Sequence, residues 1–316
     1  MSAPLTREAA ARRAPGWLSR GRSLASMVKL AHTVFAAPFA IAAALLATRH
    51  PHAEVTLGRA IAIAVALVSA RTAAMGYNRL VDRDVDAINP RTARRELPAG
   101  VVSPTAARLL VVLSSLAFCG AAMALGRWPA MLALPVLAVL LGYSHAKRFT
   151  WGAHLWLGVA LALAPGGAWI AMGAAPSFGI VALMLAVASW VAGFDVLYSL
   201  QDEVFDRGQG LRSIPSRFGA RGALLFSRVL HVLTVLSLAA AGLLLDAGPF
   251  YAAATALVAA LLAYEHSLVR PEPSDPERKP SLARLDQAFF DVNGWVSIGF
   301  LALVAVDVWR GWKGAR

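Results

Sequence analysis

The chain has 316 residues, of which 58% are hydrophobic and 15% are charged, and its formal net charge is +12. A soluble domain is typically about half apolar and about a quarter charged, so this composition excludes a single soluble core and requires lipid as the outer solvent. Lys and Arg in the cytoplasmic loops of a membrane protein explain the positive charge, and no nucleic-acid partner is expected.

Nine stretches are long and apolar enough for a membrane-spanning helix, which needs about 20 mostly apolar residues. No strand pattern or heptad repeat accompanies them. We therefore predict an all-α, polytopic membrane protein with about nine transmembrane helices. In chain order, the predicted helices are residues 28–48, 58–80, 105–125, 128–146, 152–173, 178–200, 219–245, 248–268 and 285–308.

The linkers between these helices differ in length and charge. Residues 81–104, 201–218 and 269–284 form long, polar linkers that carry many of the Lys and Arg residues, and the tail before the first helix is also basic. Positive loops favour the cytoplasmic side of a membrane. We predict a multi-pass protein of a bacterial-type inner membrane, with these linkers and the N-terminus in the cytosol. Residues 1–25 would form a basic cytosolic tail, 26–310 a single transmembrane domain and 311–316 a short tail.

A first acidic cluster follows the second predicted helix. Asn78, Asp82 and Asp86 are spaced four apart, so they lie along one face of a helix at about 100° per residue. Asp84 points away from that face. Arg71 precedes Asn78 by seven residues and lies on the same face, deeper in the membrane.

A second acidic cluster follows the sixth predicted helix. Asp195, Asp202 and Asp206 are separated by seven and four residues, which again places them on one helix face, with Tyr198 beside them. A single Asp near a helix end is commonly a solvated cap or part of a loop ion pair. Two aligned sets are better explained by function, because ionisable residues that face a helix bundle are costly.

Facing carboxylates repel one another unless a cation lies between them. Oxygen ligands suit Mg²⁺, which binds through a few carboxylates together with substrate phosphates, whereas no His or Cys grouping fits zinc. We predict a Mg²⁺ site whose ligands are Asn78, Asp82, Asp86, Asp195, Asp202 and Asp206.

Basic side chains accompany the acidic clusters. The basic residues in or beside the same face are Arg71, Arg83, Arg94, Lys147, Arg148 and Arg212. Carboxylate-bound Mg²⁺ surrounded by Arg and Lys is how a protein holds a diphosphate. Lys147 and Arg148 alone could equally be cytoplasmic-side charges, but Arg71 lies within an apolar run.

These motifs resemble the UbiA superfamily of intramembrane aromatic prenyltransferases, over nearly the whole chain after residue 25. The first family signature is matched by Asn78, Asp82 and Asp86, followed by Asn89-Pro90-Arg91-Thr92. The second is matched by Asp195, Tyr198, Asp202 and Asp206. A third, at the end of the fourth predicted helix, is matched by Tyr143, Lys147, Arg148 and Thr150.

The resemblance implies a nine-helix fold around a central cavity capped by cytosolic loops. It also implies Mg²⁺-dependent transfer of a chain from polyprenyl diphosphate to a hydroxyaryl carboxylate of the 4-hydroxybenzoate type, in respiratory quinone biosynthesis. Tyr198, Phe194 and Phe290 are candidates to flank the allylic carbocation, although such rings are more often ordinary packing residues. The implied catalytic residues are Asp82, Asp86, Asp202 and Asp206. The implied substrate-binding residues are Arg71, Asn78, Tyr143, Lys147, Arg148, Tyr198 and Arg212.

The acceptor has a second candidate. Arg212-Ser213 stands where the family often has Lys-Ser, and no Asp lies near His32 at the entry to the first helix. The run 193–215 is similar to a subgroup linked to menaquinone made through futalosine, which favours 1,4-dihydroxy-6-naphthoate. Arg71 would bind either the acceptor carboxylate or the diphosphate.

Other classes of membrane protein also use buried carboxylates. An ion-coupled transporter usually places them near the bilayer middle, whereas here they lie at helix ends. A CDP-alcohol phosphotransferase has Asp-Gly and Ala-Arg between its acidic residues, and both are missing here. A lipid-binding scaffold explains neither acidic cluster.

Overall fold

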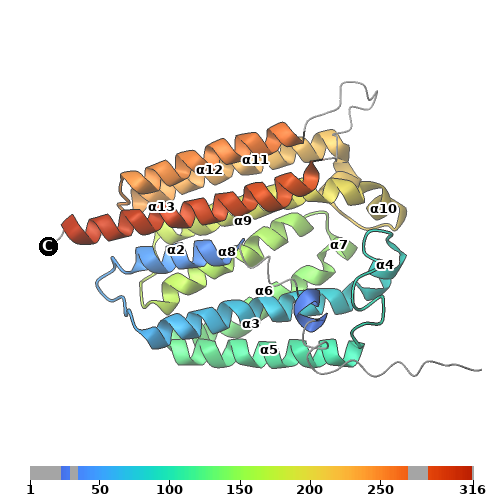
Figure 1. Cartoon of the computed structure of the whole chain (residues 1–316), viewed down its shortest axis with the longest axis horizontal. Coiled ribbons are helices and arrows are strands. Elements are labelled where there is room, and N and C mark those ends of the chain that lie inside the picture. Colours follow the sequence, from blue (N-terminus) through green and yellow to red (C-terminus); the bar gives the residue numbers. More distant parts are fainter. Residues whose placement is uncertain (1–22, 29–34, 270–283, 315–316) are drawn as a thin grey trace, which may run out of the picture.

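The computed structural model describes residues 23–28, 35–269 and 284–314, and these residues form helices and connecting turns without a strand. Each of the nine predicted segments overlaps one of the main helices of the bundle (Figure 1). These helices are α2 (Ala37–Ala47), α3 (Leu57–Val81), α5 (Pro104–Leu125), α6 (Arg127–Gly142), α8 (Ala153–Ala171), α9 (Phe178–Tyr198), α11 (Ile214–Leu244), α12 (Pro249–Leu268) and α13 (Asn293–Gly314). His32 and most of the predicted tail 1–25 lie outside the described residues.

Seven of the described helices are long and apolar enough to cross a membrane. The two main helices outside this set are α2, with 11 residues, and α12, which carries Glu265 and His266 in its last turn. Large apolar side chains such as Leu57, Leu134 and Leu243 are exposed on the outside of the bundle, where lipid would cover them. The prediction of an all-helical, multi-pass membrane protein is confirmed.

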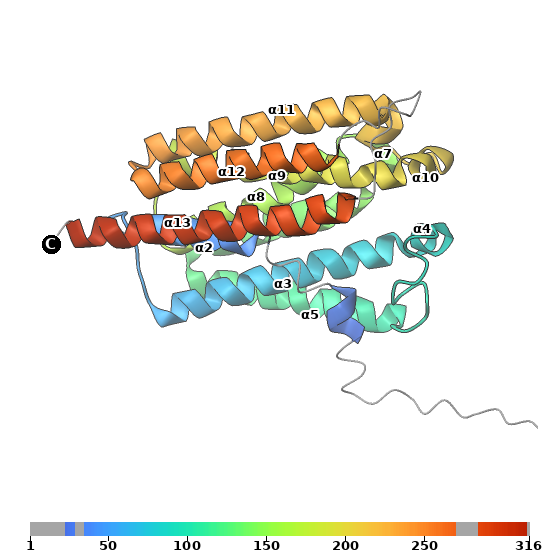
Figure 2. The ribbon, with the colours of Figure 1, turned by 45° about the horizontal axis from the view of Figure 1, so that its top comes forward.

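Three short helices gather at one end of the bundle. They are α4 (Arg83–Ile88), α7 (Ala146–Phe149) and α10 (Glu203–Gly208), and both views place them together, opposite the C-terminus (Figures 1 and 2). We call this end the polar end. The segments that follow α3, α6 and α9 therefore share one side, as predicted for the charged linkers 81–104 and 201–218. Most of the third charged linker, 269–284, lies outside the described residues.

Local sequence explains where several helices begin. Thr56, Ser103, Ser177 and Ser213 each precede a helix and accept a hydrogen bond from a first-turn backbone N–H through the side-chain oxygen. Within α11, Gly219 has a φ of 68°, and the helix bends there. The predicted seventh helix started at residue 219, so the sequence located the straight part of α11.

The core lies around α9. The Trp190 side chain is fully buried, and its ring centroid is 5.0 Å from that of Phe39, which stacks on Phe300 at 4.7 Å. These contacts join α9 to α2 and α13 through large rings. The packed half of the molecule thus holds α8 and α9 in place, and a cavity lies between them and α3 and α6.

Candidate active site

A cavity of about 580 Å³ follows the length of three helices. Residues between 63 and 82 line it from α3, residues between 129 and 148 from α6 and α7, and residues between 154 and 171 from α8. On α3 the lining residues recur every three or four positions, as one helix face requires. Every predicted metal-ligand, catalytic and substrate-binding residue lines this cavity except Arg212. The basic residues Arg83 and Arg94, expected in or beside the same face, do not line it either.

The first acidic cluster lies where α3 gives way to α4. The helix is interrupted at Asp82, but the backbone N–H of Asp82 donates to Asn78 O (2.9 Å) and that of Asp86 donates to Asp82 O (2.7 Å). The four-residue spacing therefore still brings all three side chains to the cavity. The Asp84 side chain is 86% exposed and pairs with Arg83 at the surface, so it faces away as expected.

The second acidic cluster lies on three successive segments. Asp195 belongs to α9, Asp202 ends the 3₁₀ turn Ser199–Asp202, and Asp206 belongs to α10. Asp202 and Asp206 are buried, and all three line the cavity together with Tyr198. The change of helix type between Tyr198 and Glu203 does not separate the acidic residues from the cavity.

Each of the four predicted catalytic carboxylates is held by a basic side chain. Such charge-assisted hydrogen bonds are short and directional, so they fix the geometry of both partners. The pairs are Arg148 Nη2 with Asp82 Oδ1 (3.1 Å), Arg95 Nη1 with both oxygens of Asp86 (2.7 and 2.8 Å), Arg91 Nε and Nη2 with Asp202 (3.0 and 2.6 Å), and Lys147 Nζ with Asp206 Oδ2 (3.0 Å).

These pairs connect the two acidic clusters to each other. The neighbouring residues Lys147 and Arg148 reach opposite clusters from α7, because consecutive helical side chains point about 100° apart. Arg91 extends from the segment after α4 to Asp202 of the second cluster. The polar end is therefore cross-linked by ion pairs.

Burial changes the acid–base properties of two groups at the polar end. Burial raises the pKa of Asp82 above its ordinary value, and the charge of Arg148 only partly offsets this. Burial lowers the pKa of Arg91, but its hydrogen bonds to Asp202 and the charge of Asp202 outweigh burial, so the net pKa is raised. Arg91 stays cationic, and an additional cation near Asp82 would favour its ionised form.

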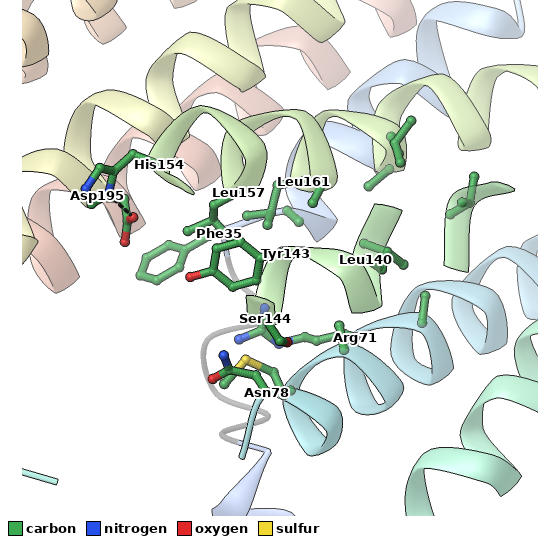
Figure 3. A pocket seen from close by; sticks show the side chains of 18 of the residues that line it. Phe35, Arg71, Asn78, Leu140, Tyr143, Ser144, His154, Leu157, Leu161 and Asp195 are labelled. Atoms are coloured by element: carbon green, nitrogen blue, oxygen red, sulfur yellow. Dashed lines mark hydrogen bonds and ion pairs between the residues drawn. The ribbon is translucent and has the colours of Figure 1, made fainter. Parts of the chain in front are cut away.

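Deeper in the cavity, polar side chains from α3 and the end of α6 meet. Figure 3 shows Arg71, Asn78, Tyr143 and Ser144 around a common space. Asn78 Nδ2 donates to Asp82 Oδ2 (2.8 Å), whereas the buried atoms Arg71 Nε and Ser144 Oγ have no hydrogen-bond partner among the described residues. Buried polar atoms are normally paired, so these two fit a site that a polar ligand completes.

His154 is a cavity residue that the sequence reasoning missed. Its Nδ1 lies 2.6 Å from Asp195 Oδ2, and its side chain is almost completely buried in α8 (Figure 3). The signal in the sequence that could have identified it is a histidine inside the otherwise apolar stretch 152–173.

Arg91, Arg95 and Ser144 were also not predicted as site residues. The role of Asp195 as a metal ligand stays a prediction.

Aromatic rings cover the cavity beside the second acidic cluster. We call this group the aromatic wall. Phe289 stacks on Tyr198 with 3.9 Å between ring centroids and meets Phe194 edge-on at 5.3 Å. Phe35 and Phe289 were not predicted. The residues of the aromatic wall, all of which line the cavity, are Phe35, Phe194, Tyr198, Phe289 and Phe290.

The acidic residues do not form a metal cage of their own. Within the described part of the chain, no three His, Cys, Asp or Glu side chains are grouped closely enough to hold a metal ion. Their donors are oxygens, and basic side chains surround them. This donor set fits Mg²⁺ that arrives with a phosphate ligand, because Mg²⁺ binds through one or two carboxylates plus substrate phosphates.

Arg212 lies beside the cavity rather than in its lining. Its Nη1 donates to Phe149 O (2.6 Å), and its backbone N–H donates to Lys147 O (2.7 Å). These bonds tie the start of α11 to α7 and thus help to position Lys147 and Arg148. The substrate-binding role of Arg212 stays a prediction.

Comparisons with known proteins agree with the family resemblance of the sequence motifs. Residues 36–290 match the UbiA prenyltransferase family. A 4-hydroxybenzoate octaprenyltransferase of Vibrio cholerae is 32% identical over 241 residues, which cover 76% of this chain and 81% of the relative. The apo structure of a UbiA homologue from Aeropyrum pernix K1 has a TM-score of 0.77 and 35% identity, covering 88% of this chain and 98% of that one. A UbiA homologue from Archaeoglobus fulgidus bound to GPP and Mg²⁺ has a TM-score of 0.71 and 20% identity, covering 90% and 99%.

Proposed function

This chain belongs to the UbiA prenyltransferase family and is a prenyltransferase, and we propose that it transfers a polyprenyl chain from polyprenyl diphosphate to a hydroxyaryl carboxylate of the 4-hydroxybenzoate type. The observation that carries this proposal is one cavity with ion-paired carboxylates at one end and a long apolar face at the other. Membership of this family excludes the alternative that the chain is an ion-coupled transporter. The relatives named 4-hydroxybenzoate octaprenyltransferase support this acceptor class.

The polar end is proposed to bind the diphosphate. Its four basic side chains pair with carboxylates at 2.6–3.1 Å. When the substrate binds, the same N–H groups can donate to phosphate oxygens instead. The released carboxylates would then be free to hold Mg²⁺, which would neutralise the charge of the diphosphate and make it a better leaving group. The proposed diphosphate ligands are Arg91, Arg95, Lys147 and Arg148, and the proposed metal ligands include Asp82, Asp86, Asp202 and Asp206.

The length of the apolar face supports a polyprenyl donor. Lining residues Ile63 and Asp82 are 19 positions apart along α3 and its end, which corresponds to about 28 Å of helix. Three extended chain bonds span roughly 3.5 Å, so an isoprene unit with four chain bonds spans roughly 4.5 Å. By these values the cavity accommodates about six extended units.

The acceptor is proposed to lie between the two ends, near Arg71. A carboxylate in a low-dielectric site requires a cation and hydrogen-bond donors, because an unpaired buried charge is costly. The guanidinium of Arg71 and the hydroxyl of Ser144 lie in the cavity lining with unpartnered buried atoms. These groups would orient the ring so that the carbon ortho to its hydroxyl faces the first carbon of the prenyl chain.

In the proposed reaction, the bond between that first carbon and a diphosphate oxygen breaks. The departing electron pair stays on the diphosphate, where the Arg and Lys side chains stabilise the charge. The ortho carbon then bonds to the allylic cation, and the ring loses its proton. The aromatic wall would flank the cation and exclude water from it.

Purified protein with labelled polyprenyl diphosphate, Mg²⁺ and a panel of acceptors tests this function. We expect labelled prenyl 4-hydroxybenzoate, formed only with the metal ion. A strong preference for 1,4-dihydroxy-6-naphthoate would move the acceptor to the menaquinone alternative. Equal rates with uncharged phenols would remove the carboxylate requirement.

We also propose that the polar end faces the cytosol of a bacterial-type inner membrane. In a background with Cys119→Ala, a single cysteine is placed at exposed Gln209 at the polar end or at exposed Ala175 at the opposite end. A membrane-impermeant thiol reagent should label intact cells only with Ala175→Cys. Labelling of Gln209→Cys without permeabilisation would contradict this orientation.

A further inference from the structure

A π-helix precedes α13 and carries part of the aromatic wall. It spans Gln287–Val292 and contributes Phe289 and Phe290 to the cavity lining. The wider turn of a π-helix disrupts the regular hydrogen-bond ladder where it joins an α-helix, and such segments occur frequently at functional sites. The carbonyl oxygens at this junction therefore need another donor.

Asn293 supplies that donor from the first position of α13. Its Nδ2 donates to Ala288 O (3.1 Å) and to Phe289 O (3.3 Å), both within the π-helix. The same amide nitrogen donates to Glu265 Oε1 (3.0 Å) on α12, and Asn293 Oδ1 accepts from Trp190 Nε1 (2.7 Å) on α9. One side chain thus ties the π-helix to two other helices.

This network is completely enclosed. Trp190 and Asn293 are 0% exposed, and Glu265 is 1% exposed. None of the three lines the cavity, so none touches a substrate there. Polar and ionisable groups inside a membrane protein are costly and are kept where they have a function. Among the described residues, the network reaches the aromatic wall at two points: Asn293 Nδ2 donates to the backbone oxygen of Phe289, and the Trp190 ring meets the Phe194 ring edge-on at 5.2 Å.

Phe289 occupies the centre of the aromatic wall. Its ring contacts those of Phe35, Phe194, Tyr198 and Phe290, at centroid distances between 3.9 and 5.7 Å. Tyr198 in turn has Arg91 over its ring, at 5.7 Å from the centroid, and Arg91 is the partner of Asp202. A shift of the Phe289 backbone would therefore open the wall directly beside the diphosphate site.

We propose that Trp190, Glu265 and Asn293 are positioning residues that fix Phe289 and thereby decide whether the prenyl cation reaches the acceptor or water. This inference rests on the proposed function. In transfer, the first prenyl carbon bonds to the acceptor ring, which loses a proton. In diversion, the same carbon bonds to a water oxygen, which loses a proton, and prenyl alcohol forms. Diphosphate leaves with the bonding electrons in both cases.

The share of prenyl groups released as alcohol is the diagnostic quantity, because it does not depend on how much active protein is present. Purified variants receive labelled geranylgeranyl diphosphate and Mg²⁺, with and without 4-hydroxybenzoate. With acceptor, Asn293→Leu should raise the share of alcohol several-fold. Without acceptor, it should raise the rate of alcohol formation. Phe289→Ala should act in the same direction while leaving the buried network intact.

Matched variants separate positioning from general stability. Glu265→Gln keeps an oxygen that accepts from Asn293 and should leave the share of alcohol near its original value, whereas Glu265→Leu should raise it. Ser189→Ala breaks another buried bond on α9, the 2.9 Å contact with Thr234 Oγ1, and should not change the share. Glu265→Leu and Phe289→Ala keep the inference testable where Asn293→Leu does not fold.

Two outcomes would overturn the inference. If Asn293→Leu lowered turnover but left the share of alcohol unchanged, the network would stabilise the fold without controlling the access of water to the cation. An unchanged share in Phe289→Ala would show that the wall does not exclude water. If the unaltered protein formed no prenylated carboxylate while Asn293→Leu and Phe289→Ala still raised the rate of alcohol formation without acceptor, the proposed acceptor would be wrong and the exclusion of water by the aromatic wall would stand.

Discussion

The two ends of the cavity differ in how they are built. At the polar end, the four predicted catalytic carboxylates are each fixed by an Arg or Lys side chain, and the pairs cross between separate segments. At the other end, the lining from residues 63–70, 122–136 and 160–171 contains only apolar side chains and glycines. The polar end thus depends on particular atoms, whereas the apolar end depends on free volume. Substitutions should abolish activity at the first and change selectivity at the second.

The largest effects are expected from the paired carboxylates. Alanine at Asp82, Asp86, Asp202 or Asp206 removes a proposed metal ligand and leaves a basic side chain unpaired. Turnover should fall by roughly a hundredfold to a thousandfold, the loss typical for one charge-stabilising group in an active site. Prenyl transfer at saturating substrates, with protein checked for folding by size-exclusion chromatography, measures this loss.

Asp84→Ala is the matched control for this series. It removes a carboxylate of the same cluster whose side chain is 86% exposed and pairs with its surface neighbour Arg83. Its turnover should stay close to that of the unaltered protein. If Asp84→Ala were the most damaging of the five substitutions, the assignment of the helix face would be wrong.

The carboxylates could be predicted because their spacing survives the local structure. Asn78, Asp82 and Asp86 keep four-residue backbone hydrogen bonds across the interruption at Asp82, so a regular helix was an adequate approximation. The same approximation placed Asp202 and Asp206 on one side, although a 3₁₀ turn and a new helix separate them from α9.

The partners of the carboxylates were harder to predict from one sequence. Arg91 and Arg95 follow α4 in a segment without periodicity, and their positions depend on how that segment turns back over the cavity. The interhelical pair of His154 and Asp195 depends on the packing of α8 against α9. Arg212 carried the expected charge, but the backbone directs it to Phe149 O. Tertiary contacts decide all three cases.

Arg71→Ala should give the next largest effect. Loss of a charge-assisted hydrogen bond to the acceptor carboxylate is worth about 1.5–3 kcal/mol, so the acceptor KM should rise about tenfold to hundredfold. The donor KM should change much less. Arg71→Lys, which keeps the charge but loses the planar fork, should give an intermediate acceptor KM. A larger rise in the donor KM would assign Arg71 to the diphosphate.

A smaller and more selective effect is expected at the apolar end. Gly167 lines the cavity, and a Cβ added there meets no atom within 4 Å. Gly167 is 13 positions beyond His154 on α8, or about 20 Å along the helix. Gly167→Leu should lower kcat/KM with an eight-unit donor by roughly tenfold. The value of kcat/KM with geranyl diphosphate should stay unchanged, because that donor is too short to reach the new side chain.

Gly120→Leu on α5 provides the control for this substitution. An added Cβ at Gly120 also meets no atom within 4 Å, but this residue is exposed and does not line the cavity. Kinetic constants with donors of both lengths should therefore stay unchanged. Equal losses with short and long donors in Gly167→Leu would mean that this end of the cavity does not select for chain length.

The smallest expected effect concerns the stability of the polar end without Mg²⁺. Burial raises the pKa of Asp82, so the folded protein holds this proton more tightly than the unfolded chain does. The corresponding stability is present at low pH and is lost as the pH rises through the raised pKa. Asp82→Asn should therefore unfold a few degrees above the unaltered protein at pH 8 in chelator, and this gap should close as the pH falls.

This measurement tests whether the ionised carboxylate of Asp82, which the proposed reaction needs, lowers the stability of the folded protein. The asparagine keeps an oxygen that can accept from Arg148 Nη2, as Asp82 Oδ1 does at 3.1 Å, but it carries no charge to desolvate. Mg²⁺ with inorganic diphosphate should stabilise the unaltered protein more than Asp82→Asn, because ligands stabilise the form that binds them. Asp84→Asn, at an exposed position, should show no gap at any pH. If Asp82→Asn were instead less stable at pH 8, and its deficit disappeared at low pH, the carboxylate would stabilise the fold, and the contrast between the two ends would not extend to stability.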